Sequence, residues 1–536
     1  MSTALDLDPS DYGGVPAPRP AIGMGQWFSA RARRGGHRPA LSFEGRTWTY
    51  GELAGEVDRL VTVLADGGLK PGMRVAYLGF NHPMFFVALF ATTKLGAIFL
   101  PLNFRLTGPE LAYIINDAGA HTLLADSAHH AVLDGVRESL CCRTFWNADG
   151  KAADAARWPA LSDALAAASP GTAPAAAPSA DDVAMIMYTS GTTGRPKGAM
   201  LTHGNFWWNH VAELYTMDVM ADDRLLVFAP VFHIGGLNVL TLTTFLKGGH
   251  VVLQRHFDPA IALAALAEHR ISTVFAVPAM LLFMSQQPEF AKTDLSALRL
   301  IMCGGAPCPE PLLHLYNGRG IAIQQGYGLT ETASMVAALT AEYAATKIGS
   351  VGHTTLLTQI RLIDSEGGEV TEPLARGEIC VRGPNVMRGY WNQPEATRQA
   401  LSADGWFRTG DVGYRDADGF YYVCDRVKDM IITGGENVYP AEIESVLAGH
   451  PAIAEVAVIG VPDEKWGETV VAVAALKPGH TLGLDELQAF AGERLARYKL
   501  PRQLQLVAAL PRNPTGKILK YKLRDEQRQA PGGGTN

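Results

Sequence analysis

Cysteine is scarce in this sequence, and its pattern excludes two classes of protein. The chain has only 6 cysteines in 536 residues, and no two of them form a Cys-x-x-Cys pair. Cys141 and Cys142 are adjacent, while Cys303 and Cys308 have no histidine at the spacing of a metal site. The sequence therefore predicts neither a disulfide framework nor a structural zinc site.

Basic residues are also fewer than acidic ones. The 46 Lys and Arg residues are outnumbered by 53 Asp and Glu residues, which gives a net charge of -7. A basic surface for nucleic acid and a polybasic anchor for anionic lipid are therefore not expected. The N-terminal stretch MSTALDLDPSDYGGVPAPRP is acidic and lacks the basic-then-apolar order of a secretion signal. These features predict a cytoplasmic protein.

The sequence has no uninterrupted apolar run of the length that a membrane span needs. Its most apolar window, residues 84–101, is interrupted by Lys94 and Gly96. This window predicts a buried helix that leads into a strand. A second apolar run, residues 335–339, is expected to form a plain buried helix.

The order of the other patterns predicts an α/β fold. A chain of 536 residues exceeds a single core, so at least two domains are expected. Strand-like runs such as 75–78 and 251–253 alternate with helical patterns, which indicates doubly wound parallel sheets. Asp-Gly pairs at 404–405 and 418–419 then predict hairpins of a small antiparallel β unit, at about residues 345–424.

Domain boundaries follow from these changes of pattern. Residues 1–30 are expected to form a flexible tail, and residues 31–427 a large N-terminal domain. A charged hinge at Lys428 leads into a small α+β domain over residues 428–536.

A loop rich in glycine and hydroxyl groups, YTSGTTGRPKGAM at residues 188–200, follows an apolar strand-like run. Such a loop lets the backbone approach a phosphate closely. Its spacing differs from the familiar phosphate loop, because Gly191 and Gly194 are separated by two residues and Lys197 is followed by glycine. Alone, a loop of this kind is usually only a turn.

Further candidate residues come at the ends of strands or in turns. CGGAPCP (303–309) and QGYGLTET (325–332) each end an apolar run, where open α/β sheets bind ligands. Tyr327 offers a flat face to a base, and Glu331 offers a hard oxygen to Mg²⁺. Asp411 and Arg426 are suited to the two hydroxyls of a ribose. PRNPTGKI (511–518) is a turn that presents Lys517.

Taken together, these motifs resemble those of the adenylate-forming superfamily of acyl-CoA synthetases, adenylation domains and luciferases. Six motifs occur in the family's order: the Ser/Thr/Gly loop, an aromatic-His turn, GYGLTE, RTGD, DRVKD and the terminal lysine loop. The similarity extends over residues 30–525.

The resemblance implies a role for each motif. It makes Lys517, Glu331, Thr330 and His233 catalytic, with Glu331 as the metal ligand. It implies that the ATP and AMP site consists of Thr189, Ser190, Gly191, Thr192, Thr193, Gly194, Lys197, Gly304, Gly305, Ala306, Pro307, Gly326, Tyr327, Gly328, Asp411, Val423 and Arg426. It also implies that coenzyme A is bound by Gly434, Gly435 and Trp466, after the mobile small domain has turned about the hinge at Lys428.

The implied reaction has two steps. A carboxylate attacks the α-phosphorus of ATP, and Mg²⁺ and the Lys517 ammonium stabilise the charge that grows as pyrophosphate leaves. The acyl-adenylate is then attacked by the thiol of coenzyme A.

The residues that match the family's acyl pocket predict a hydrophobic acid. They are small or apolar, or at least uncharged: His233, Asn238, Val277, Gly304, Gly328, Ala333 and Met335. The turn at residues 232–235 has no carboxylate to pair with the ammonium of an amino acid. A fatty, aryl or bulky cyclic carboxylic acid is therefore expected.

Plainer interpretations stay open for several residues. His233 alone fits a core histidine, Glu331 a helix cap, Tyr327 core packing, and Lys517 a solvated lysine. Trp466 fits packing of the small domain as well as contact with pantetheine.

The final acceptor of the acyl group also stays open. The hinge and the Gly434–Gly435 loop favour coenzyme A, and the alternative is an acyl carrier protein or another nucleophile. An inactive nucleotide-binding scaffold is disfavoured by the intact Lys517 and Glu331, and nothing in the sequence demands a luciferase-like oxygenase.

Overall fold

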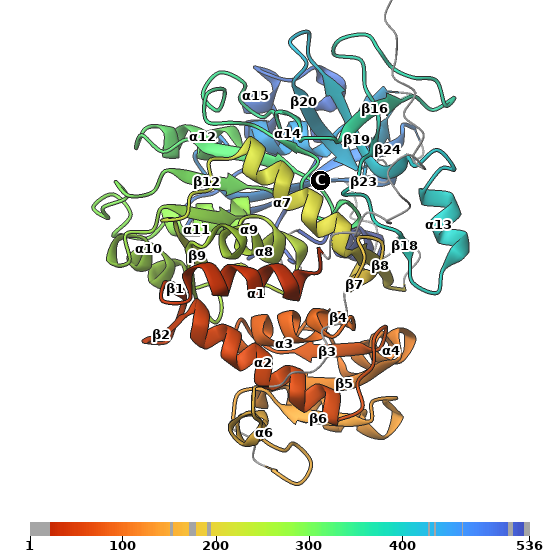
Figure 1. Cartoon of the computed structure of the whole chain (residues 1–536). Helices are drawn as coiled ribbons and strands as arrows, with labels where there is room; N and C mark the ends of the chain where they lie inside the picture. Colours follow the sequence, from red (N-terminus) through yellow and green to blue (C-terminus); the bar gives the residue numbers. More distant parts are fainter. Residues whose placement is uncertain are drawn as a thin grey trace, which may run out of the picture.

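The computed structural model describes residues 22–150, 154–170, 178–189, 195–426, 429–433, 436–463, 465–512 and 518–529. The molecule has three tiers, with β3–β6 at the lower end of Figure 1 and the antiparallel and C-terminal sheets at the upper end. The predicted tail over residues 1–30 lies mostly outside the described residues. Its last part, however, belongs to helix α1 (Met24–Gly35).

The first sheet has seven strands in the order β18-β8-β7-β4-β3-β5-β6. Five of them are parallel: β3 (Arg74–Leu78), β4 (Ile98–Leu102), β5 (Ala120–Ala125), β6 (Thr144–Asn147) and β7 (Val183–Thr189). Two antiparallel strands, β8 (Lys197–Thr202) and β18 (Gly389–Tyr390), extend one edge. The helices of this tier are α2 (Tyr50–Asp66), α3 (Pro83–Lys94), α4 (Gly108–Ala118), α5 (His130–Asp134) and α6 (Leu161–Ala167).

The second sheet has nine strands in the order β15-β14-β13-β12-β11-β9-β10-β1-β2. Its parallel centre comprises β1 (Pro39–Phe43), β9 (Arg224–Val227), β10 (His250–Leu253), β11 (Thr273–Ala276), β12 (Leu300–Cys303) and β13 (Ile323–Tyr327). Antiparallel strands flank this centre: β2 (Arg46–Thr49), β14 (Ala337–Ala338) and β15 (His353–Thr354). Its helices are α7 (His203–Thr216), α8 (Ile234–Asn238), α9 (Thr241–Lys247), α10 (Pro259–Glu268), α11 (Pro278–Ser285) and α12 (Glu310–Asn317).

Helix α3 lies in the core that the two sheets share. Every residue from Pro83 to Thr93 is buried, since the helix is apolar on all sides. It ends at Lys94 and leads into β4, which confirms the buried helix and strand predicted from the apolar window. Among the described residues, no helix combines the length and the apolarity that crossing a membrane requires.

A third, antiparallel sheet follows in the order β16-β17-β19-β20. Its strands are β16 (Gln359–Ile363), β17 (Gly377–Arg382), β19 (Phe407–Arg415) and β20 (Tyr421–Arg426). The Asp418–Gly419 turn joins β19 to β20, as predicted, with Gly419 at a φ of 90° that favours glycine. The Asp404–Gly405 turn follows α13 (Pro394–Ala400) and leads into β19, and Leu401 and Phe407 on either side of it form one antiparallel bridge.

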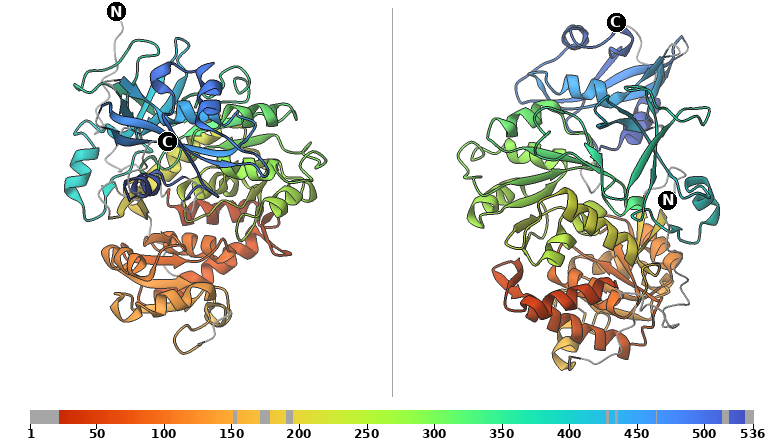
Figure 2. Two further views of the ribbon diagram at one scale, coloured as in Figure 1. Left: turned by 180° about the vertical axis from the view of Figure 1, so that it is seen from behind. Right: turned by 45° about the horizontal axis from the view of Figure 1, so that its top comes forward.

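The C-terminal residues form a separate sheet with its own apolar cluster. Its strands are β21 (Ile431–Thr433), β22 (Glu436–Val438), β23 (Ile453–Asp463), β24 (Gly467–Leu476) and β25 (Gln503–Leu506), and its helices α14 (Pro440–Leu447), α15 (Leu484–Gly492) and α16 (Lys520–Gln529). The residues of this cluster all lie between Ile431 and Leu504. Figure 2 shows this part at one end of the molecule, beside the antiparallel sheet. Contacts across this junction include Arg376, whose guanidinium lies 4.2 Å from the Tyr439 ring.

The prediction of a helix over residues 335–339 is wrong. These residues contain strand β14, which pairs with β13 on one side and β15 on the other. The reason lies just before the strand, where φ is 52° at Ala333 and 111° at Ser334. Left-handed backbone at these two residues reverses the chain, so the apolar run returns along β13 as a strand.

Candidate active site

The carboxyl ends of two neighbouring strands bring the predicted nucleotide glycines together. Gly304 follows β12, and Gly326 lies in the adjacent β13. A Cβ on Gly304 would lie 3.0 Å from the carbonyl oxygen of Gly326, so a side chain there requires the strand ends to move apart. The next residues of this loop, Gly305, Ala306 and Pro307, are exposed. The strand end is therefore open to a ligand at the edge where α/β sheets bind one.

Position 328 requires glycine, because the backbone of Ser334 approaches it closely. A Cβ at this position would lie 1.4 Å from the carbonyl oxygen of Ser334. No side chain fits such a gap, so the turn after Tyr327 and the segment at Ser334 are packed backbone against backbone.

Tyr327, Asp411 and Arg426 form one polar group, in which Tyr327 and Asp411 are buried and Arg426 is half-buried. The Tyr327 hydroxyl donates to Asp411 Oδ2 over 2.7 Å, and Arg426 Nε lies 2.6 Å from Asp411 Oδ1. Asp411 and Arg426 are opposite each other on β19 and β20, with Val423 also on β20. Burial, and then the Asp411 carboxylate, raises the pKa of Tyr327 well above its usual value. The phenol therefore stays protonated and donates.

The Glu331 carboxylate also interacts electrostatically with Arg426. Burial by itself would lower the pKa of Arg426, but Asp411 and Glu331 among its neighbours hold it above its ordinary value. The guanidinium is thus permanently charged between two carboxylates, which suits binding of a polyanionic nucleotide.

Glu331 lies buried in a short turn, Thr330–Thr332, and is held by two hydroxyls. Thr189, at the end of β7, donates to Glu331 Oε1 over 3.2 Å. Tyr390, in β18, donates to the same oxygen over 3.1 Å. Both bonds are accepted by Oε1, and among the described residues none is accepted by Oε2, which leaves that oxygen as the candidate metal ligand.

The donor set around Glu331 fits Mg²⁺ in a nucleotide site. Within the described residues, no group of three or more His, Cys, Asp or Glu side chains is placed to hold a metal ion alone. Mg²⁺ in such sites commonly takes one or two carboxylates and completes its shell with phosphates and water. One carboxylate beside a threonine hydroxyl matches this pattern.

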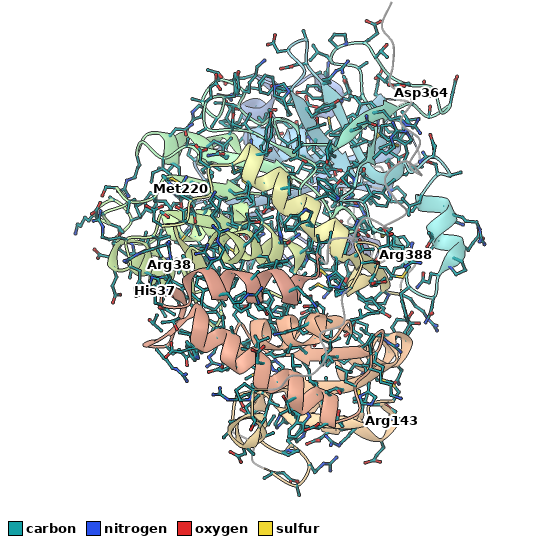
Figure 3. All side chains as sticks on the ribbon, in the orientation of Figure 1. His37, Arg38, Arg143, Met220, Asp364 and Arg388 are labelled. Carbon is teal, nitrogen blue, oxygen red and sulfur yellow. The ribbon has the colours of Figure 1, made fainter. Side chains whose placement is uncertain are left out.

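Tyr390 is a site residue that the sequence analysis missed. Besides its bond to Glu331, its ring lies 5.0 Å from Lys197 Nζ, a predicted phosphate ligand. Arg388, labelled in Figure 3, comes directly before β18 and donates its backbone N–H to Met200 in β8 over 3.0 Å. The only signal in the sequence is the aromatic pair in RGYWNQPE, because nothing local indicates that this strand joins the first sheet.

The aromatic-His turn leads into helix α8. His233 is exposed at the residue before α8, while Phe232 is buried. The His233 N–H donates to Pro230 over 3.2 Å. A Cβ on Gly236 would lie 2.3 Å from the Pro230 carbonyl oxygen, so this tight turn requires glycine. Exposure argues against the interpretation of His233 as a core histidine.

Predicted acyl-pocket residues lie close to one another or to glycines of the predicted nucleotide site. The Asn238 side-chain amide donates to the carbonyl of Ala333. A Cβ on Gly326 would lie 3.0 Å from the Met335 methyl carbon, and one on Gly305 would lie 3.5 Å from Val277. These residues thus converge from α8, the end of β11 and the segment after Glu331.

Trp466 carries two cations at its ring. It is 37% exposed, with Arg502 4.1 Å and Lys465 4.9 Å from the ring centroid. Both distances lie within cation–π range, so the ring packs against two cations.

Several predicted site residues lie outside the described residues. They are Ser190, Gly191, Thr192, Thr193, Gly194, Lys428, Gly434, Gly435 and Lys517. The described neighbours of three of these segments pair with each other: Thr189 with Lys197, Thr433 with Glu436, and Arg512 with Ile518.

Comparison with known proteins agrees with this geometry. Residues 28–391 match the AMP-binding enzyme family, and residues 442–517 match the AMP-binding enzyme C-terminal domain. A feruloyl-CoA synthase from Amycolatopsis is 45% identical over 94% of this chain and 98% of its own. An indoleacetate–CoA ligase from Aromatoleum aromaticum is 40% identical over 94% and 97%.

A solved structure shows the same fold with a reaction intermediate bound. The o-succinylbenzoate CoA synthetase from Bacillus subtilis, in complex with its acyl-adenylate, superimposes with a TM-score of 0.82. It is 34% identical and covers 95% of this chain and 99% of its own. The chain therefore belongs to the AMP-binding enzymes of the adenylate-forming superfamily, as an acid–thiol ligase that makes an acyl-adenylate from ATP with Mg²⁺ and transfers the acyl group to coenzyme A.

Proposed function

We propose that this ligase activates an aromatic carboxylic acid with a short side chain, the class that includes ferulate and indoleacetate. The relatives named for these two acids are 45% and 40% identical to this chain. The turn at Phe232–Gly235 supports the proposal, because it has no carboxylate to pair with an amino group. The apolar Val277, Ala333 and Met335 favour a hydrophobic acid.

A straight-chain fatty acid is the second candidate. A long-chain-fatty-acid–CoA ligase from Mycobacterium tuberculosis is 39% identical over 89% of this chain and 93% of its own. Both classes fit an apolar pocket, so they are distinguished by measurement of rates with each acid.

The observation that carries the proposed site is the pair of polar groups around Glu331 and Asp411. Glu331, with Thr189 and Tyr390, is proposed to face the phosphates, and Asp411 with Arg426 to bind the ribose. Arg426 connects the two groups electrostatically, because both carboxylates act on its guanidinium. Nucleotide binding at this position puts the α-phosphorus between Glu331 and the acyl pocket.

In this proposal, residues 189–197 bind the β- and γ-phosphates before pyrophosphate leaves. Hydroxyls and backbone N–H groups of Thr189–Gly194, together with Lys197, accept a polyanion without enclosing it. Mg²⁺, when bound, neutralises phosphate charge. The Lys517 ammonium stabilises the charge that develops on the α-phosphoryl oxygens as the carboxylate attacks. Thr330 orients this turn, and Gly304–Pro307 with the Tyr327 ring receive the base.

The second step is proposed to need a movement of the small domain. We assign residues 31–427 to the large domain and 428–536 to the small one, with Lys428 as the hinge. Rotation about this hinge exchanges Lys517 for the Gly434–Gly435 loop at the site, while Trp466 with its two cations receives part of coenzyme A. His233 lies at the boundary of the acyl pocket and the thiol entrance. The reaction is assigned to the cytoplasm.

Hydroxamate trapping tests the proposal. The enzyme is incubated with ATP, Mg²⁺, hydroxylamine and a panel of acids that includes ferulate, cinnamate, indoleacetate and fatty acids of increasing length. Fastest trapping with an aromatic acid is expected, and fastest trapping with fatty acids would reverse the two candidates. Acids that react are then tested with coenzyme A and with an acyl carrier protein, the alternative acceptor.

A further inference from the structure

The segment Thr332–Met335 has a backbone conformation that needs support from its surroundings. It follows Glu331 directly, and φ is 52° at Ala333 and 111° at Ser334. Left-handed backbone at residues other than glycine is strained and persists only where neighbouring contacts over-determine it. Strain of this kind often occurs at functional sites, so the contacts that hold the segment are of interest.

Three buried asparagines from three places in the chain hold this segment. Asn238, at the end of α8, donates its side-chain amide to the Ala333 carbonyl. Asn209, in α7, accepts the Met335 N–H at 3.0 Å. Asn385 donates to the Thr332 carbonyl over 3.2 Å and to the Met335 carbonyl over 2.9 Å. Every one of these bonds is to backbone, so the asparagines fix the path of the chain rather than its side chains.

A second layer of polar residues holds two of the asparagines in turn. Asn209 donates to Glu213 Oε1 over 2.9 Å, and Thr243 donates to the other oxygen of Glu213. His210 Nε2 lies 2.8 Å from the Asn238 side-chain oxygen. Because the Asn238 nitrogen is committed to a carbonyl, its oxygen faces His210, and His210 carries its proton on Nε2. Neither asparagine is free to turn.

A purely structural role is the plain alternative, since buried polar groups are normally hydrogen-bonded. Asn81 is an example: its side chain bonds to the backbone of Ala229, Val231 and Gln254 and joins the two large sheets. The three asparagines differ from Asn81 in that all of them converge on one four-residue segment, in which Ala333 and Ser334 have strained backbone. Two residues of this segment, Ala333 and Met335, belong to the proposed acyl pocket.

We propose that Asn209, Asn238 and Asn385 are positioning residues that fix the wall of the acyl pocket and thereby determine which acids are accepted. The inference rests on the proposed location of that pocket. The three asparagines keep the strained backbone of Thr332–Met335 in one position relative to α7 and α8. The proposed acyl pocket therefore has a fixed width. Without them the segment relaxes and the width of the pocket changes, whereas the Tyr327–Asp411 bond joins two side chains outside the segment.

Leucine variants provide the test, because leucine has the same branching and the same number of side-chain heavy atoms as asparagine but makes no hydrogen bonds. Asn238→Leu and Asn209→Leu are expected to raise the KM for the preferred acid by about tenfold, the usual order for loss of a buried polar contact. The KM for ATP is expected to change by less than twofold. The preference among the acids of the hydroxamate panel is expected to flatten.

Asn81→Leu is the matched control. Like the test variants, it removes a buried asparagine whose side chain bonds to backbone, but at a place away from Thr332–Met335. Comparable loss of melting temperature without a change in acid preference is expected. If Asn238→Leu and Asn81→Leu alter the ratio of the two KM values equally, the asparagines are only structural and the proposal is overturned.

A second pair of variants and the choice of acid keep the proposal testable if the leucine variants do not fold or the substrate class is wrong. If the leucine variants do not fold, Asn209→Asp is compared with Asn209→Ala well below pH 8, where Glu213 keeps its proton and can donate it to the aspartate. Aspartate also keeps the acceptor for the Met335 N–H. Recovery of the wild-type acid preference by aspartate supports the proposal, and equal behaviour of the two variants contradicts it. If the wild-type enzyme does not react with aromatic acids, only the proposed substrate class is refuted. The asparagine variants are then measured with the acid that reacts fastest, so the positioning role is still tested.

Discussion

Tyr327 and Asp411 lie 84 positions apart in the sequence, yet the phenol of one donates a 2.7 Å hydrogen bond to the carboxylate of the other. The bond joins the end of a parallel strand, β13, to the antiparallel sheet that follows it. Because Asp411 is also paired with Arg426, the site combines residues from two sheets of different type. The orientation of the carboxylate that is proposed to bind the ribose therefore depends on the residue proposed to contact the base.

The two contributions of Tyr327 are separable by substitution. Tyr327→Phe removes the hydroxyl and keeps the ring, whereas Tyr327→Leu removes both. Loss of the hydrogen bond to a charged group is worth about 1.5–3 kcal/mol at most, so the KM for ATP is expected to rise about tenfold in Tyr327→Phe. A further rise is expected in Tyr327→Leu, because a stacking face is also lost. Identical KM values for the two variants would contradict a role for the ring.

Glu331→Gln tests the proposed metal ligand. Glutamine keeps an oxygen for the Thr189 and Tyr390 hydroxyls but removes the negative charge. Adenylation, measured as acid-dependent pyrophosphate exchange, is expected to fall by about 100-fold, the order seen when one charge-stabilising group is lost. The Mg²⁺ concentration for half-maximal rate is also expected to rise. A normal Mg²⁺ dependence in the variant would indicate that the carboxylate serves only as a turn cap.

Most of the fold was predictable because its signals are local. The run at residues 84–101 is apolar on all sides, and the structure has a buried helix and a strand there. The apolar run at 335–339 was misassigned, because the chain reversal at Ala333 and Ser334 depends on contacts with Asn209, Asn238 and Asn385. Tyr390 was missed for the same reason: its strand pairs with β8, almost 190 positions earlier.

Lys517→Ala tests the proposal that one lysine serves the first step only. The described residues Arg512 and Ile518 pair on either side of its turn, so the turn is expected to survive the substitution. Pyrophosphate exchange is expected to fall by two or more orders of magnitude, while thioester formation from supplied acyl-adenylate stays near the wild-type rate. Lys522→Ala, an exposed lysine in α16, is the matched control and is expected to change neither rate.

Lys428→Pro tests the hinge. Proline fixes φ near −65° and so limits the backbone rotation that a hinge must absorb. Thioester formation from supplied acyl-adenylate is expected to fall at least tenfold more than pyrophosphate exchange does. Lys428→Ala removes the same side chain and leaves the backbone free, so both rates are expected to stay close to wild type. Equal losses of the two half-reactions in the proline variant would argue against a rotating domain.

Glu213 is expected to make the stability of the fold depend on pH, because its hydrogen-bonding neighbours do not offset the effect of burial on its pKa. Burial raises the pKa of this carboxyl from its ordinary 4.5 to about 8, despite hydrogen bonds from Thr243 and Asn209. The folded protein therefore keeps a proton that the unfolded chain releases, at every pH between these two values. Unfolding then releases that proton, so the contribution of Glu213 to stability is greatest below about pH 4.5 and declines as the pH rises towards 8.

Glu213→Gln is expected to remove this decline, because glutamine has no proton to release. Thermal unfolding of wild type and variant between pH 5 and 8 measures the effect, with the buffer changed and the ionic strength held constant. The difference in melting temperature between the two proteins is expected to shift in favour of the variant as the pH rises. Parallel curves over this range would mean that Glu213 is already ionised in the folded protein, and that its bonds to Thr243 and Asn209 are strong enough to hold a buried charge.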